Sequence, residues 1–404
     1  MTSTMTTPPN SGVGVGAGNP APANLGRSPM AATPQAAASA IPFTRGSTDA
    51  TMRDASRTYT FGETDQVQLQ TNAFLAAIEL EFIVTTTGNS AAVAFTADAP
   101  WNLINQVKLD DPAGQSIMAP ISGYGLYLLN KYLPDTSCGF DPKDDPGYLA
   151  VTGTAANGGS ISFRLVIPVE HRHRDAFGAL NNSAANQRYL LTITTATSTA
   201  VLYSTAPTTP PTSITMNVYQ RYWTSPPAVI TSAAGQVAVQ QTPTGLGTVA
   251  FTRYERHNEV SGGGSPQIQL NNVGDYISSL VFVLRNSSGA REGADWPPEF
   301  DFWVNDFQVH ALGVNQWTKA MARFYGYDRA AAEAAGGLDT GVYVLYTLNG
   351  LFDRVADFAP ASQYLPTDAT TKLQIRGSEW GASASVLEVY TRMIRPSSGA
   401  ALFG

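Results

Sequence analysis

The chain has 404 residues, of which 43% are hydrophobic and only 14% are charged, against roughly 25% charged in ordinary soluble domains. Its formal net charge of −7 has the wrong sign for neutralising nucleic-acid phosphates, so no direct sequence-specific nucleic-acid binding is expected. The single cysteine, Cys138, excludes an internal disulfide framework and any zinc or iron–sulfur site built on cysteines.

The first 57 residues are rich in Thr, Ser, Pro, Gly and Ala. Such a segment cannot bury enough apolar surface to offset roughly 1–2 kcal/mol per residue of backbone ordering, so residues 1–57 are predicted to be a flexible, disordered arm. Four arginines and two aspartates give this arm a net charge of +2, which leaves −9 for the remainder. Neither a signal peptide nor an apolar run near the roughly 20 residues of a bilayer crossing is visible.

From residue 58 onward, short alternating apolar runs are bounded by Gly, Pro, Asn and Asp, which is typical of antiparallel strands with one buried face. A first set of predicted strands covers residues 75–84, 106–109, 160–167, 189–194 and 214–222. A second set covers residues 276–284, 300–309, 341–348, 372–375 and 385–393. Residues 224–248, with three prolines and three glycines, are predicted to be the linker between the sets.

The two sets show the same features in the same order, which indicates an internal repeat. The matching segments are 78–88 with 277–287, 105–109 with 305–309, 161–167 with 342–348, and 217–221 with 388–392. A proline–tryptophan pair follows the first strand of each half, as Pro100-Trp101 and Trp296-Pro297. Helical spacing then marks Ile121, Tyr124 and Leu128 in one half, and Trp317, Met321, Phe324 and Tyr325 in the other.

These observations predict an all-β protein of two tandem eight-stranded jelly-roll sandwiches, each with a short helix, behind the N-terminal arm. The first roll is placed at residues 58–223 and the second at residues 249–396, with a C-terminal tail at 397–404. Each repeat is longer than the roughly 100 residues of an immunoglobulin-type sandwich, which favours the jelly roll.

The histidine-rich segment that follows residue 168 is the one candidate metal site. On a strand, His171 and His173 would share a face and could bind an ion, but arginines alternate with them and no third ligand has a fixed spacing. Pro168 should end the preceding strand, so the segment is interpreted as a polar loop.

Acidic and aromatic residues offer the remaining candidates for chemistry. The pairs Asp110-Asp111 and Asp144-Asp145 could act as glycosidase carboxylates. However, proline and glycine lie next to both pairs in the sequence, which favours a role in capping turns. The six tryptophans could stack sugars, yet they fall inside strand and helix patterns, which favours core or subunit-interface positions. No nucleophile, zinc-protease or phosphate-loop motif occurs, so no catalytic, cofactor or metal residue is predicted and the chain is not expected to be an enzyme.

The region of residues 75–132 carries a likeness to a known family. Its marks are Thr87-Gly88-Asn89 after an apolar strand, then residues 99–104 (Ala-Pro-Trp-Asn-Leu-Ile), a strand with Asp110 and Gly114, and the helix from Ile121. In these features the sequence resembles the double jelly-roll major capsid proteins of tectivirus-like tailless bacteriophages with an internal membrane.

The resemblance implies a structural role in the virion. Three copies would form a pseudo-hexagonal capsomer, and capsomers would tile an icosahedral shell over a lipid vesicle. Partners would then be two further copies, neighbouring capsomers, penton or cement proteins, and the internal membrane through the N-terminal arm. The protein would be made in the host cytoplasm. Two other readings stay open: a two-domain carbohydrate-binding or glycan-hydrolysing protein, and a virion spike or adhesin.

Overall fold

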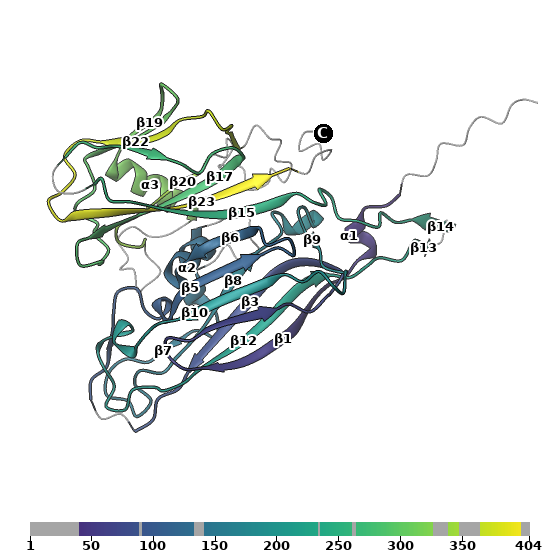
Figure 1. Ribbon diagram of the computed structural model, residues 1–404, viewed down its shortest axis with the longest axis horizontal. Coiled ribbons are helices and arrows are strands. Elements are labelled where there is room, and N and C mark those ends of the chain that lie inside the picture. Colours follow the sequence, from purple (N-terminus) through teal and green to yellow (C-terminus); the bar gives the residue numbers. More distant parts are fainter. Residues whose placement is uncertain are drawn as a thin grey trace, which may run out of the picture. The chain divides into compact units, whose positions relative to one another are not determined.

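The computed structural model describes residues 40–88, 91–132, 141–232, 235–260, 264–325, 338–346 and 364–396. Antiparallel strands dominate these residues, and two helices of ten or more residues lie among them (Figure 1). Most of the predicted arm (1–39), Cys138 and the predicted tail (397–404) lie outside the described residues.

The first roll consists of two sheets whose inner faces share one hydrophobic core. One sheet has the order β1-β12-β3-β8-β7, with β9 paired to β3, and the other has the order β2-β10-β5-β6. The bounds are β1 (Asp49–Tyr59), β2 (Thr64–Gln68), β3 (Phe74–Val84), β5 (Ile104–Asp110), β6 (Ser116–Ile121), β7 (Leu149–Ala150), β8 (Ile161–Pro168), β9 (Leu180–Asn181), β10 (Leu190–Thr195) and β12 (Ile214–Trp223). The short strands β4 (Ala94–Phe95) and β11 (Tyr203–Thr205) pair with each other, and helix α2 (Gly123–Tyr132) follows β6.

The second roll repeats this topology. Its sheets have the orders β15-β23-β17-β20, with β21 paired to β17, and β16-β22-β18-β19. The bounds are β15 (Val249–His257), β16 (Gln267–Leu270), β17 (Tyr276–Asn286), β18 (Glu299–Val304), β19 (Phe307–Gly313), β20 (Val342–Tyr346), β21 (Leu365–Pro366), β22 (Leu373–Gly377) and β23 (Ala384–Arg395). Helix α3 (Val314–Tyr325) follows β19 just as α2 follows β6. Eight strands of each roll therefore correspond one to one, which confirms the predicted double jelly roll.

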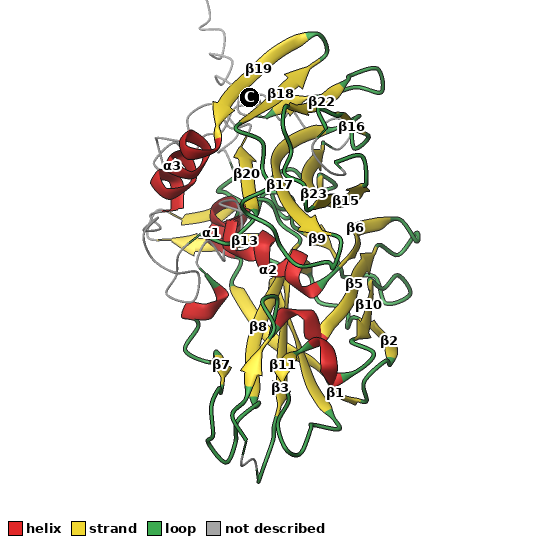
Figure 2. Ribbon diagram, turned by 90° about the vertical axis from the view of Figure 1, so that its left-hand side faces the viewer, coloured by secondary structure: helices red, strands yellow, loops and turns green. Residues whose placement is uncertain are grey.

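The two rolls are joined at one sheet edge. Strand β6 of the first roll and β15 of the second lie parallel and are bridged at Met118 and Thr252, so one sheet continues from the first roll into the second. Helix α2 lies between the strands of the two rolls (Figure 2). A single core cluster includes buried side chains from both rolls and from α2.

Burial differs between equivalent strands. In β3, Leu80 and Phe82 are buried while Glu79 and Glu81 are half-exposed, the alternation of a sheet with one wet face. In β17, every residue from Ile277 to Leu284 is buried. The sheet of the second roll that contains β17 is therefore covered on both faces, whereas the sheet of the first roll that contains β3 is covered on one face.

The predicted flexible arm ends too late in the sequence, because part of residues 1–57 is ordered. Residues 40–57 are ordered: α1 (Phe43–Gly46) is followed by β1, which pairs with β12 from Asp49 to Tyr59. Phe43 is buried against Phe74 and Trp223. The composition of this segment is too polar to predict a core strand, but β1 is an edge strand held by its backbone ladder, which needs few large apolar side chains.

Two further sequence expectations need correction. Residues 300–309 do not form one strand, because a turn at Asn305 and Asp306 separates β18 from β19, and Asn305 adopts a left-handed φ of 54°. The match of residues 105–109 with 305–309 is consequently displaced, since the counterpart of β5 is β18. Within the predicted linker, β13 (Val229–Ser232) and β14 (Gly235–Ala238) form a hairpin.

Candidate functional site: the contact between the two rolls

Helix α2 occupies the contact because two glycines let it approach its neighbours closely. A Cβ atom on Gly123 would lie 2.2 Å from the backbone oxygen of Trp101, and one on Gly125 would lie 2.4 Å from the Tyr390 ring. Trp101 also stacks on Tyr127 of the helix, with ring centroids 4.4 Å apart. All ten residues of α2 are buried, so the helix is part of the joint between the rolls.

A fully buried ion triad lies at the end of α2. The Lys131 Nζ is 2.9 Å from Asp141 Oδ2 and 2.8 Å from Asp339 Oδ2, and all three side chains have no exposed surface. Asp141 belongs to the first roll, whereas Asp339 precedes β20 of the second. The hydroxyl of Tyr132 donates to Asp339 at 2.6 Å. Lys131 of the first roll therefore forms an ion pair with a carboxylate of each roll.

The electrostatics of this triad are set by burial and by the lysine. Burial alone would raise the pKa of Asp339, but the Lys131 ammonium and the Tyr132 hydroxyl together lower it below its ordinary value. Burial, reinforced by the Asp339 charge, raises the pKa of both Tyr127 and Tyr132 well above 10. The tyrosines therefore stay neutral and serve as hydrogen-bond donors to the carboxylates.

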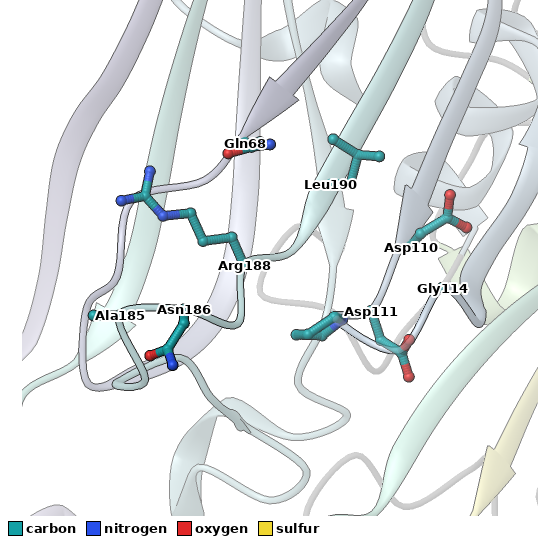
Figure 3. Close-up of a pocket in the computed structure, with 9 residues that line it drawn as sticks. Gln68, Asp110, Asp111, Gly114, Ala185, Asn186, Arg188 and Leu190 are labelled. Carbon is teal, nitrogen blue, oxygen red and sulfur yellow. The ribbon is translucent and has the colours of Figure 1, made fainter.

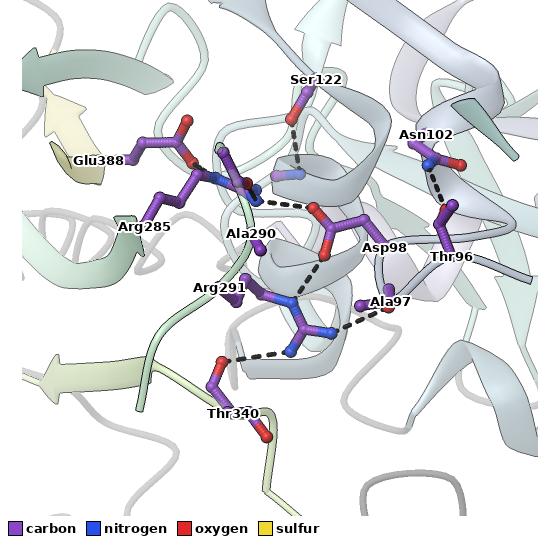
Figure 4. A network of polar contacts seen from close by, with 12 residues as sticks. Thr96, Ala97, Asp98, Asn102, Ser122, Arg285, Ala290, Arg291, Thr340 and Glu388 are labelled. Atoms are coloured by element: carbon purple, nitrogen blue, oxygen red, sulfur yellow. Dashed lines mark hydrogen bonds and ion pairs between the residues drawn. The ribbon is translucent and has the colours of Figure 1, made fainter. Parts of the chain in front are cut away.

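A second ionic cluster joins the rolls around Asp98, which precedes the 3-10 turn at Trp101–Leu103. Its carboxylate binds Arg285 Nη1 at 2.7 Å and Arg291 Nε at 2.6 Å (Figure 4). Arg285 also binds Glu388 of β23 at 2.8 Å. The Arg291 guanidinium lies 4.8 Å from the Tyr124 ring of α2. One carboxylate of the first roll thus fixes two arginines of the second.

The histidines of the candidate metal site do not act together. β8 ends at Pro168, and the segment after it is a polar loop, as predicted. His171 is buried with its Nε2 2.5 Å from the Tyr364 hydroxyl, whereas His173 Nδ1 lies 2.5 Å from Glu170 and its ring stacks on Trp223. Burial, with the nearby charges of Arg392 and Arg172, lowers the pKa of His171 to about 3. Among the described residues, no group of three or more His, Cys, Asp or Glu could hold a metal ion.

The acidic pairs serve structural roles. Asp111 Oδ1 accepts from the backbone nitrogens of Ala113 and Gln115 at 2.9 and 2.7 Å, and Asp145 Oδ1 accepts from Gly147 at 2.7 Å. Both are turn caps, as the sequence favoured.

A pocket of about 490 Å³ lies beside Asp110 and Asp111, lined also by Gln68 and Arg188 (Figure 3). The Asp110 carboxylate there binds Lys108 at 2.7 Å, and the Asp111 carboxylate caps its turn. Both carboxylates of this pocket thus already bind other groups of the chain.

The tryptophans lie in the core. Trp101, Trp223, Trp296, Trp317 and Trp380 are buried. Trp303 is half-buried, with the Arg376 guanidinium 4.0 Å from its ring. None of the six is therefore an open platform for stacking a sugar. No described helix is long and apolar enough to cross a membrane.

The sequence does not predict which residues join the two rolls. Lys131 had a usable signal, because it is a charge inside the apolar helical stretch at residues 124–132. Asp98, Arg291 and Asp339 lie in loops rich in similar polar residues, where nothing local indicates long-range ion pairing.

No protein-family model and no curated protein matches the sequence. Solved structures do match the fold. The major capsid protein of Sulfolobus turreted icosahedral virus has a TM-score of 0.60 and 13% identity, covering 87% of this chain and 97% of that one. The PBCV-1 virus capsid has a TM-score of 0.58 and 11% identity, covering 88% of this chain and 95% of that one. This chain therefore has the double jelly-roll fold of these viral capsid proteins.

Proposed function

We propose that the protein is the major capsid protein of an icosahedral virus, made in the host cytoplasm and assembled into the virion shell. The observation that carries the proposal is the pairing, within one chain, of two rolls with the same strand order. Because each subunit contains two equivalent rolls, a trimer has six similar sides. Such an object can tile a surface with hexagonal packing, as a shell requires.

The chemistry of the described residues agrees with a role performed by interfaces. Opposite charges pair within each charged cluster, Asp111 and Asp145 cap turns, and five of the six tryptophans are buried. The proposal therefore assigns no enzymatic activity. The six tryptophans, all of them in the described residues, offer no open platform for the carbohydrate-binding alternative.

Contact of the N-terminal arm with an internal membrane is part of the proposal, but the fold weakens its electrostatic basis. Because β1 takes up residues 49–59, the segment before residue 40 contains one charged side chain, Arg27. One basic residue contributes about 1 kcal/mol near an anionic bilayer. Membrane contact would therefore depend on many arms acting together in a shell, and neighbouring capsomers, penton or cement proteins are the competing partners.

The test is the assembly state of the purified protein. Light scattering should give a trimer of about 128 kDa, three times the 42.8 kDa chain, and negative-stain micrographs should show hexagonal capsomers. A protein that stays monomeric at all concentrations contradicts the proposal. Elongated fibres would favour a spike, and a glycan-array signal lost on mutating Trp303 would favour the carbohydrate-binding alternative.

Flotation with anionic vesicles tests the membrane contact separately. Trimers should float with phosphatidylserine vesicles only when the arm is present, and flotation that survives deletion of residues 1–39 contradicts this part of the proposal.

A further inference from the structure

The ion triad at the end of α2 holds an amine against two carboxyl groups in a fully buried site. Lys131 Nζ is 2.8 Å from Asp339 Oδ2 and 2.9 Å from Asp141 Oδ2, and none of the three side chains has exposed surface. An amine bonded in this way to a carboxyl oxygen lies within about 4 Å of the carboxyl carbon, close to the ~3–3.5 Å separation of atoms poised to react. The triad is therefore arranged for a reaction as well as for charge pairing.

The cation of this triad is a lysine, whereas the ionic cluster around Asp98 uses arginines. A guanidinium stays charged, but a buried lysine can give up its proton and become a nucleophilic amine. Arg285 and Arg291 therefore bind Asp98 by charge alone, while Lys131 also brings a group that can react. Burial favours loss of the proton, because its transfer from the ammonium to a carboxylate removes two buried charges.

The two carboxyl groups differ in their other partners. Asp339 accepts from the Tyr132 hydroxyl at 2.6 Å and from the Tyr127 hydroxyl at 3.3 Å. Two donors aimed at one carboxyl group polarise its carbon and stabilise negative charge on its oxygens, as an oxyanion hole does. Asp141 instead accepts from the backbone nitrogen of Lys143 at 3.0 Å, and its Oδ2 is 3.5 Å from the Tyr127 hydroxyl. Asp339 is therefore the better electrophile, and Asp141 is free to carry a proton.

We propose that the Lys131 amine and the Asp339 carboxyl group condense to an amide, which joins the two rolls by a covalent bond within the chain. One proton passes from the Lys131 ammonium to the Asp339 carboxylate, and the nitrogen electron pair then attacks Asp339 Cγ. Asp141 takes a proton from the nitrogen of the tetrahedral intermediate and gives it to the departing hydroxyl. The C–O bond breaks, one water leaves and Asp141 is again an anion, so the step needs no oxidant or co-reactant.

Burial also preserves the product. The site excludes the bulk water that would hydrolyse the amide. The ionic triad is the state before reaction, so the ion-pair contribution to stability applies to chains that are not yet linked. The inference does not depend on the proposed function, because the bond forms within a single chain.

Mass spectrometry of the full-length protein tests the bond directly. After incubation of the folded protein at neutral pH and denaturation in reductant, the intact mass should be that of the unlinked chain less one water molecule. Trypsin should no longer cut after Lys131 and should release residues 109–143 joined to residues 330–354. Protein that keeps the full mass overturns the inference. A link confined to residues 109–143 also overturns it, because Asp141 would then be the electrophile.

Two variants separate the covalent bond from the ion pairs. Lys131→Arg keeps the cation but cannot form the amide, so it should keep the full mass and be cut by trypsin after residue 131. Asp141→Asn removes the proton carrier and should slow the linking by at least about 100-fold. Water loss from Lys131→Arg, or unchanged linking in Asp141→Asn, overturns the inference. The measurement on the unmodified protein remains decisive if either variant fails to fold.

The pair Lys108 and Asp110 is a matched control in the same digest. Its N···O distance of 2.7 Å is as short as those of the triad, but the lysine side chain is 33% exposed. Because solvent stabilises its ammonium, Lys108 should stay unlinked and trypsin should cut after it. A link at Lys108 would show that proximity alone gives the product, and it would overturn the role assigned to burial and to Asp141.

Discussion

Replacing Lys131 with methionine tests the ion triad between the rolls. Methionine keeps most of the aliphatic volume but removes the ammonium that lies 2.9 Å from Asp141 and 2.8 Å from Asp339. Two carboxylates are then left buried without their cation. Breaking a buried pair by removing one partner costs about 3–5 kcal/mol, so Lys131→Met should lower the free energy of unfolding by that amount.

Urea unfolding followed by tryptophan fluorescence measures the effect. With a slope of about 3 kcal/mol per molar urea, the midpoint should fall by about 1–1.7 M. The matched control is Lys108→Met, whose ammonium is 2.7 Å from Asp110 but whose side chain is 33% exposed. Because solvent reaches this lysine, its loss should cost less than the loss of the fully buried Lys131. If Lys131→Met costs no more than this control, the triad does not hold the rolls together.

The pH dependence gives the same reasoning an independent check. Because the pKa of Asp339 is held below its ordinary value of 3.8 in the folded chain, its contribution is present above pH 3.8. The contribution is lost as the pH falls through the lower folded value. The Lys131→Met variant should lose less stability over that acid range than the unmodified protein. Adding Asp339→Asn to Lys131→Met should cost less than the sum of the single changes, because the two residues interact directly.

Three other changes probe the joint and its surroundings. Asp98→Asn weakens two arginine contacts at once and should lower the unfolding free energy by about 2–3 kcal/mol in urea. Gly123→Ala places a methyl group 2.2 Å from the Trp101 oxygen and should cost about 1–3 kcal/mol, whereas Gly264→Ala, with its nearest neighbour at 3.8 Å, should be neutral in the same assay. His171 has a pKa near 6.5 in the unfolded chain and about 3 in the folded chain. As the pH falls from 7.5 to 5, the free energy of unfolding of the unmodified protein should therefore drop by about 2 kcal/mol relative to that of His171→Gln. Equal pH profiles for the two proteins would contradict this.

The order of the strands could be predicted from the sequence because it depends on local patterns. Alternation at residues 78–84 and the continuous apolar run at 280–284 place β3 and β17, and Pro168 correctly ends β8. The sequence predicts the repeat because each half has a pair of proline and tryptophan followed by a helical pattern, in the same order. These signals lie within ten or so neighbouring residues.

Other features depend on contacts far along the chain and had no local pattern. β1 is polar and is held by backbone bonds to β12, more than 150 residues away. The pair Lys131 and Asp339 is separated by 208 positions, and neither partner predicts the other. The Asn305-Asp306 turn is a weaker hairpin signal than Asn-Gly, so the sequence predicts one strand where β18 and β19 form two.

The helices that follow β6 and β19 occupy equivalent positions in the two rolls but differ in chemistry. α2 brings Gly123 and Gly125 to the joint and ends in a buried lysine, which permits a close, charge-fixed approach. α3 contains no glycine and leaves Lys319 exposed. The internal joint forms once, during folding, and can use buried ion pairs to specify a single arrangement. Of the two equivalent helices, α2 thus carries the glycines and the buried lysine that the contact between the rolls uses.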